Sequence, residues 1–197
     1  MKFDVKGRVA SVNDLLGAAL RCPLCGEPLA VVGNSLVCAG ARRHTYDMAR
    51  AGYVNLNTHL PQSGDTAEMA AARQAFLRRG YYAPLADALV RTAQAHTPDT
   101  SLLCDAGCGE GYYTSAVYRA LRDAGKAPCM AGTDISKAIL RRAAKREKDV
   151  EFAVASSYHL PVVDGAVDLL VNCFSPLAIE EFRRVLAPGG WFCYVVP

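Results

Sequence analysis

The chain has 197 residues, of which 51% are hydrophobic and 21% are charged. This composition excludes an intrinsically disordered protein, which would be poor in apolar residues and rich in net charge. The formal net charge is only +3, and its whole excess lies within residues 1–60, so it gives weak support for a polyanionic partner. No apolar run reaches about 18 residues, and we expect a cytoplasmic protein without a membrane span.

The sequence divides into four segments with different patterns. The first two are an N-terminal extension over residues 1–20, without an assigned role, and a small metal-binding module over residues 21–60. Within that module, strands are expected at residues 29–32 and 35–37, around a turn at Gly33-Asn34. Residues 61–96 are a linker with helices predicted at 66–79 and 84–95, and residues 97–197 form the largest segment.

Strands and helices alternate through this last segment. Strands are predicted at 101–104, 128–132, 150–155, 167–173 and 191–196, and helices at 112–123, 136–147 and 177–186. Regular β–α alternation is typical of a parallel sheet with helices on both faces. The fold class is therefore α/β.

The metal-binding prediction depends on four residues of the second segment. Cys22 and Cys25 are separated by two residues, Cys38 follows after twelve more, and His44 after another five. Thiolates and imidazole are the ligands that zinc prefers, and four protein ligands leave no open position for catalysis. We expect a structural zinc ion here, with free thiols and an incidental histidine as the alternative.

A glycine-rich loop follows the strand predicted at residues 101–104. Its sequence is Asp105-Ala106-Gly107-Cys108-Gly109-Glu110-Gly111, and its glycines let the backbone approach a ligand at the carboxyl end of the strand. The spacing differs from the G-x-G-x-x-G of dinucleotide enzymes. Asp134 ends the next predicted strand, where a carboxylate can accept both hydroxyls of a ribose.

These motifs resemble the class I S-adenosylmethionine-dependent methyltransferases. The loop and Asp134 fit that family, as do Ser156 after the third strand, where adenine is usually held, and Pro188-Gly189-Gly190 before the fifth. The resemblance implies a Rossmann-like methyltransferase sheet, preceded by the zinc-binding β module, with S-adenosylmethionine and zinc as cofactors. Since such sheets usually continue beyond a fifth strand, we expect this one to be incomplete at its C-terminal side.

A narrower resemblance covers about residues 21–197. The segment 44–56 behind the cysteines, Gly64-Asp65-Thr66 and Gly80-Tyr81-Tyr82 are similar to the 23S rRNA (guanine-N1)-methyltransferases, the RlmA-like family. This resemblance implies a homodimer that methylates guanine N1 in a hairpin loop of 23S rRNA. It also implies that Cys22, Cys25, Cys38 and His44 bind zinc, and that Tyr82, Gly109 and Glu110 contact the cofactor.

Two further groups are candidates for contacts with the substrate. Phe174, which follows the fourth strand, is a candidate for stacking on the base, and Asn172 or Ser175 for hydrogen bonding to its edge; the alternative is a loop whose phenylalanine caps the core. Arg42 and Arg43 lie between zinc ligands and favour RNA binding. No general base is evident.

Two other functions stay open at this stage. One is methylation of a small molecule or protein by the same fold, and the other is a shortened, non-catalytic RNA-binding relative. Basic residues at positions 141–148 are expected to form a solvated helix face.

Overall fold

The computed structural model describes residues 19–58 and 66–197. The predicted N-terminal extension therefore lies outside the described residues except for its last two positions, as do residues 61–65 of the predicted linker. Within the described ranges, no helix combines the length and the apolar character that crossing a bilayer requires.

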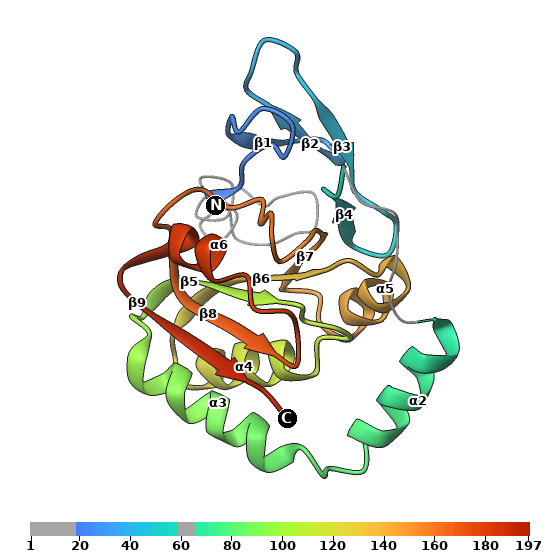
Figure 1. Ribbon diagram of the computed structural model, residues 1–197, viewed down its shortest axis with the longest axis vertical. Coiled ribbons are helices and arrows are strands. Elements are labelled where there is room, and N and C mark those ends of the chain that lie inside the picture. Colours follow the sequence, from blue (N-terminus) through green and yellow to red (C-terminus); the bar gives the residue numbers. More distant parts are fainter. Residues whose placement is uncertain (1–18, 59–65) are drawn as a thin grey trace.

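A small antiparallel sheet forms the first module, which stands apart at the top of Figure 1. Its strands are β1 (Leu29–Val32), β2 (Ser35–Cys38) and β3 (Thr45–Asp47), in the order β1-β2-β3. β1 and β2 form a hairpin whose turn contains Gly33 at a φ of +62°, which confirms the predicted turn. The antiparallel pairing brings Cys38 opposite Leu29, at the end of the hairpin that lies close to Cys22.

A six-stranded parallel sheet forms the body of the molecule, as the β–α alternation predicts. Its order is β4-β7-β6-β5-β8-β9, and the pairs along it are all parallel. The strands are β4 (Tyr53–Asn55), β5 (Thr100–Ala106), β6 (Ala127–Asp134), β7 (Glu151–Val154), β8 (Val167–Cys173) and β9 (Leu186–Val195).

Helices cover both faces of this sheet. They are α2 (Ala67–Leu77), α3 (Ala83–His96), α4 (Tyr112–Asp123), α5 (Lys137–Arg146) and α6 (Ile179–Val185). Alternate residues of a strand point to opposite faces, so Leu103 packs with the core of α3, α4 and α5, whereas Leu102 and Cys104 pack with Phe182 of α6. Leu36 of β2 is buried in the same core as Phe182 of α6.

The small module is attached to the large sheet at two places. β4 extends the sheet by pairing with β7, although the sequence pattern assigned residues 53–55 to the metal-binding module. At the second place, Leu20 forms an antiparallel bridge with Val162, and the Arg21 amide donates to the Pro161 carbonyl at 3.1 Å.

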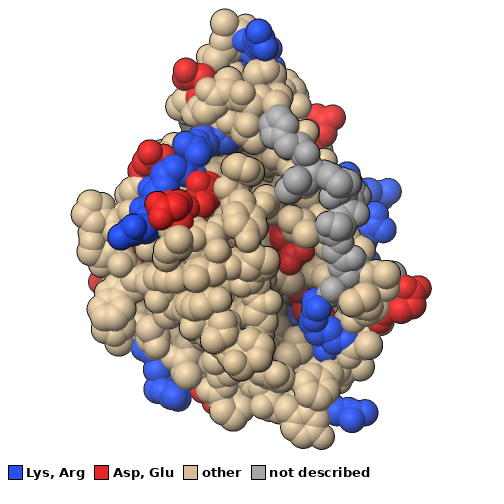
Figure 2. Space-filling view, viewed as in Figure 1, with Lys and Arg blue, Asp and Glu red and all other residues tan. Residues whose placement is uncertain are grey.

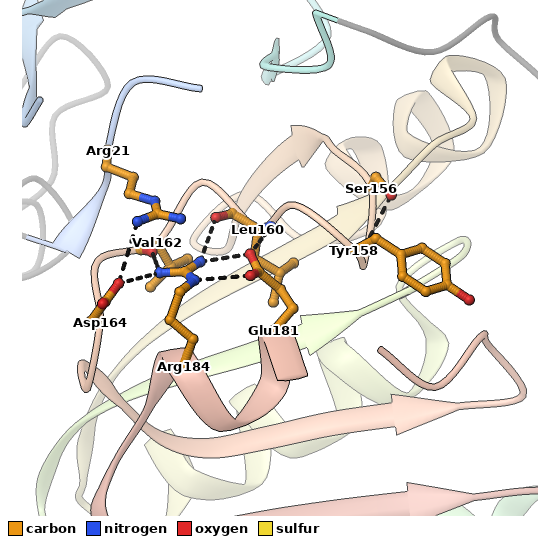
Figure 3. A network of polar contacts seen from close by, with 8 residues as sticks. All are labelled: Arg21, Ser156, Tyr158, Leu160, Val162, Asp164, Glu181 and Arg184. Atoms are coloured by element: carbon orange, nitrogen blue, oxygen red, sulfur yellow. Dashed lines mark hydrogen bonds and ion pairs between the residues drawn. The ribbon is translucent and has the colours of Figure 1, made fainter. Parts of the chain in front are cut away.

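A charged network surrounds the second attachment (Figure 3). The Arg184 guanidinium donates to Glu181 at 2.6 Å, to Asp164 at 2.6 Å and to the carbonyl of Val162 at 2.7 Å. Arg21 reaches the same Asp164 carboxylate at 3.3 Å. Figure 2 shows the resulting alternation of basic and acidic side chains between the small module and α6. The network thus fixes the β7–β8 connection to α6 and to the start of the small module.

Candidate functional site

A cleft of about 490 Å³ opens at the carboxyl ends of β5, β6 and β8, a size typical of small-molecule sites. Open α/β sheets bind ligands at this edge. The lining consists of Arg73, Phe76, Leu77, Tyr82, Gly107, Cys108, Gly109, Glu110, Tyr112, Tyr113, Asp134, Ile135, Ile139, Cys173, Phe174, Ser175 and Pro176.

Five of the eight predicted cofactor residues line this cleft: Tyr82, Gly107, Gly109, Glu110 and Asp134. The other three, Asp105, Gly111 and Ser156, lie outside its lining. The structure therefore brings the glycine loop, the end of β6 and the start of α3 to one site.

The glycine loop turns tightly between β5 and α4. The amides of Gly107 and Cys108 both donate to the Thr133 carbonyl of β6, at 2.8 and 2.9 Å. Gly107 has a φ of +81°, and a Cβ atom there would lie 2.0 Å from Ser175 Oγ. Gly111 precedes α4 at a φ of +74°. Left-handed backbone and close packing both require glycine at position 107.

Asp134 lies at the end of β6, facing the glycine loop. Its Oδ2 accepts a hydrogen bond from the Gly109 amide at 3.1 Å, and its Oδ1 accepts one from the Ser136 amide at 2.9 Å. These two hydrogen bonds therefore fix the position of the carboxylate relative to the loop. A ribose in the cleft would find the carboxylate already oriented by backbone donors.

Two other acidic side chains are buried around the loop. Asp105 lies near the end of β5 and accepts a hydrogen bond from the Thr114 hydroxyl at 2.6 Å. Burial raises its pKa to about 7, against the opposing effect of that hydrogen bond. Glu110 is 3% exposed and pairs with Arg146 at 2.6 Å. Burial raises the pKa of Glu110, although Arg146 and further arginines counteract the shift.

Aromatic side chains form the rim of the cleft. The Tyr82 ring lies edge-on to Phe174, with ring centroids 5.7 Å apart, and also contacts Phe76 at 5.9 Å. Tyr113 lies 6.5 Å from Phe174. Phe174 is 44% exposed and has a φ of +55°, which is uncommon outside glycine and marks a constrained position. The rim therefore offers planar, partly exposed surfaces for stacking.

The three candidate substrate residues have different environments. Phe174 and Ser175 line the cleft. Asn172 is fully buried, and its Nδ2 donates to the carbonyls of Ala106 at 2.9 Å and Pro176 at 3.4 Å. Among the described residues, its Oδ1 has no hydrogen-bond partner. Asn172 thus ties the end of β5 to the loop that carries Phe174.

Ser156 lies in a second cavity of about 430 Å³, between the small module and the β7–β8 connection. Its side chain is buried, and its Oγ accepts a hydrogen bond from the Tyr158 amide at 3.2 Å (Figure 3). Ser156 therefore lines this cavity and not the cleft, and its contact with the adenine stays a prediction.

The four predicted metal ligands converge in the small module. Their ligand atoms all lie within 4.8 Å of one another. Cys25 Sγ lies 3.3 Å from Cys38 Sγ and 3.5 Å from His44 Nδ1, and Cys22 Sγ lies 3.4 Å from the same nitrogen. A zinc–sulfur bond of about 2.3 Å in a tetrahedron separates sulfur ligands by about 3.8 Å, so the donor set fits zinc.

Hydrogen-bond donors around the cluster support a thiolate at Cys22. Tyr46 Oη lies 3.1 Å from Cys22 Sγ, and the Gly40 amide donates to Cys38 Sγ at 3.2 Å. Burial disfavours ionisation of Cys22, but hydrogen bonds from Tyr46 and from backbone amides lower its pKa to about 6. The cluster is therefore able to bind zinc, as the spacing of the ligands predicts.

Arg42 and Arg43 are exposed on the loop between β2 and β3, next to His44. Neither lines the cleft. Arg43 has a φ of +46°, so the tight loop around the metal ligands constrains its backbone.

Several cleft residues were not predicted from the sequence to contact the cofactor or the base: Arg73, Phe76, Tyr112, Tyr113, Ile135, Ile139 and Cys173. Phe76 lies in the helix predicted over residues 66–79, and its side chain is 46% exposed at the cleft. Tyr112-Tyr113 directly follows the glycine loop, and that adjacency is the signal that could have identified both residues.

Comparison with known proteins agrees with this geometry. Residues 20–61 match the family described as "RlmA, N-terminal", a zinc ribbon, and residues 103–190 match "Methyltransferase domain". The chain therefore joins an RlmA-type zinc ribbon to a methyltransferase domain. These matches confirm the resemblance to the RlmA-like family that the sequence motifs indicated.

Two curated relatives are similar over most of the ribbon and the domain. The 23S rRNA (guanine(748)-N(1))-methyltransferase of Streptomyces fradiae is 39% identical over 90% of this chain and 63% of its own length. A protein of Micromonospora griseorubida, whose name assigns it to guanine-N1 methylation of 23S rRNA, is 40% identical over 90% of this chain and 65% of its own length. The chain thus spans less than two thirds of the length of either relative.

Solved structures confirm the class I methyltransferase fold. An S-adenosylmethionine-dependent methyltransferase of Methanococcus maripaludis has a TM-score of 0.54 at 18% identity, covering 69% of this chain and 67% of its own. DesVI of Streptomyces venezuelae has a TM-score of 0.51 at 24% identity, covering 66% of this chain and 56% of its own. At these identities the likeness concerns the fold alone.

Proposed function

We propose that this chain transfers a methyl group from S-adenosylmethionine to N1 of a guanine in a hairpin loop of 23S rRNA. The observation that carries the proposal is a single cleft in which the glycine loop and Asp134 face the aromatic rim, within a chain that also carries an RlmA-type ribbon. The relatives named for this reaction support the choice of base.

The residues of the cleft fit S-adenosylmethionine. Asp134 would accept hydrogen bonds from the ribose hydroxyls, while the positive φ of Gly107 and Gly109 lets the loop backbone approach the ligand. Tyr82 and Glu110 complete the proposed contacts. When bound, the cofactor supplies an electrophilic methyl group on a sulfonium sulfur. The protein then needs mainly to align a nucleophile with that methyl group.

We propose that the aromatic rim receives the guanine. A base in a hairpin loop is already partly unstacked, so its extrusion is less costly than extrusion from a duplex. Phe174 offers a partly exposed ring for stacking, and Ser175 offers a hydroxyl to the edge of the base. Asn172 is buried, so its proposed role is to hold the Phe174 loop against β5.

The zinc ribbon is proposed to bind RNA through Arg42 and Arg43. Both are exposed beside the metal ligands, where they can reach phosphates. We further propose a ribbon module within residues 21–60, a methyltransferase domain over residues 97–197, a cytoplasmic location and a homodimer. Light scattering behind size-exclusion chromatography tests the dimer.

The test of the reaction is transfer of labelled methyl groups to an unmodified 23S rRNA hairpin, followed by reverse transcription. Methylation of N1 blocks Watson–Crick pairing, so the transcript should stop beside the modified guanine. Replacement of that guanine by adenine should abolish transfer. Methylation of another atom, or equal transfer to the adenine hairpin, would contradict the proposal.

Asp134→Asn tests the cofactor site by isothermal titration calorimetry. Loss of the ribose contacts should weaken S-adenosylmethionine binding at least tenfold, which corresponds to about 1.4 kcal/mol. Asp123→Asn is the matched control, because this aspartate is exposed at the end of α4 and outside the cleft. Unchanged binding by Asp134→Asn would refute the assigned role.

A further inference from the structure

A third depression lies beside the cleft, between α2 and α5. This groove of about 650 Å³ is lined by Gln74, Arg78, Ala138, Arg141, Arg142, Lys145 and Arg146. Five of these seven residues are cations and none is acidic. The sequence pattern favoured a solvated helix face for the α5 cations, but the structure places a second helix against them.

The fold of α5 explains why its cations gather on one side. Ile139, Leu140, Ala143 and Ala144 are buried against the sheet, so the charged residues of the helix face away from it. α2 then covers part of that side, and Arg142 Nη1 donates to Gln74 Oε1 at 3.0 Å. In a simple solvated face, the α5 cations would face water alone. Here α2 lies against them and its C-terminal end adds a further cation, Arg78.

The charges in this groove are only partly neutralised within the chain. Arg146 pairs with Glu110. Among the described residues, Arg78, Arg141 and Lys145 form no ion pair within 4.0 Å. The Glu110 carboxylate offsets part of the repulsion among these cations, and a bound polyanion would reduce the rest.

The groove continues the cleft. Along α2, Arg73, Phe76 and Leu77 line the cleft, whereas Gln74 and Arg78 line the groove. On the other side, Arg146 belongs to the groove and holds Glu110, which lines the cleft. A chain of phosphates in the groove would therefore run past the mouth of the cleft.

We propose that the α2–α5 groove binds the phosphate backbone of the RNA strand that flanks the guanine in the cleft. This inference rests on the proposed function and assigns the RNA a second contact surface, distinct from Arg42 and Arg43 on the ribbon. Arginine and lysine contacts to phosphates position the strand without reading its sequence. The groove thus sets which nucleotide can reach the aromatic rim.

The test compares two double variants that each remove two positive charges. Arg141→Gln/Lys145→Gln changes the groove, and Arg91→Gln/Arg122→Gln changes exposed residues of α3 and α4 that line neither cavity. Binding of a fluorescein-labelled 23S rRNA hairpin is measured by anisotropy between 50 and 200 mM KCl, which is about the range where phosphate contacts show their salt dependence. Calorimetry with S-adenosylmethionine accompanies it.

The groove variant should bind the hairpin about tenfold more weakly at low salt, and its plot of log affinity against log salt should be shallower by about 1.5. The control variant should keep the wild-type affinity and slope, and both should bind S-adenosylmethionine normally. A groove variant that binds S-adenosylmethionine normally and keeps the wild-type slope would overturn the inference.

The two proposals fail in different ways. If the wild-type chain methylates guanine N1 and the groove variant binds the hairpin as the wild type does, only the proposed RNA contact of the groove is overturned. Salt-sensitive hairpin binding that depends on the groove, without methyl transfer to guanine N1, supports the groove and overturns the proposed reaction.

Discussion

Gly107→Ala tests whether steric exclusion keeps the glycine loop in place. The added Cβ would lie 2.0 Å from Ser175 Oγ and 2.4 Å from Ser175 Cβ, well inside van der Waals contact. The backbone at this position also has a φ of +81°, which is unfavourable for alanine. The variant therefore combines a conformational cost with a packing cost.

The expected destabilisation follows from these two costs. The left-handed backbone contributes about 1–2 kcal/mol, and overpacking of a close contact contributes about 1–3 kcal/mol. Gly125 has the same φ of +81°, but a Cβ there meets nothing within 4 Å. Gly125→Ala should therefore lower the free energy of unfolding by only the first amount, and the difference between the variants isolates the clash.

Urea denaturation followed by circular dichroism measures both free energies of unfolding. A double-mutant cycle with Ser175→Gly then assigns the clash to its partner, because glycine at 175 removes both crowded atoms. In that background, Gly107→Ala should cost no more than Gly125→Ala does in the wild type. Equal costs of the two alanine variants in the wild-type background would refute the argument.

Three further variants test other features of the fold. Cys25→Ser should abolish stoichiometric zinc in mass spectrometry and lower the melting temperature, whereas Cys193→Ser, outside the cluster, should retain the metal. Arg184→Met should cost about 2–3 kcal/mol in urea denaturation, because Glu181 would lose its charged partner in a largely buried setting; an unchanged midpoint would contradict the role of the network. The pKa of Asp105 is raised to about 7 in the folded state, above its unfolded value, so the folded chain binds the extra proton between about pH 4 and 7. The stability of the wild type should therefore fall as the pH rises through that window, and Asp105→Asn should remove this part of the slope.

Local sequence patterns predicted most of the helices and strands because neighbouring residues determine where these elements form. The helix over α4 follows from its apolar spacing behind Gly111, and the predicted bounds coincide with those observed. The zinc cluster was also predictable, since C-x2-C and the β-hairpin bring the ligands together over short chain distances. The carboxyl-end position of Asp134 follows from the β–α alternation in the same way.

Features that depend on distant pairing were not predictable from such patterns. β4 has only three residues, and its place in the large sheet depends on pairing with β7 about a hundred positions later. The burial of Asn172 depends on the carbonyls of Ala106 and Pro176, and the position of Ser156 depends on how the chain leaves β7. The basic groove needed two helices from different segments to meet.

The double attachment of the zinc ribbon has a consequence for choosing a nucleotide. A ribbon held only by a linker would sample many distances from the cleft, and a base would be selected mainly by its own affinity. Here β4 and the bridge at Leu20 clamp the ribbon to the sheet from two sides. An RNA contact on the ribbon, as proposed above, would then lie at a fixed distance from the cleft. The target base would be selected by its distance along the RNA as well as by its own chemistry.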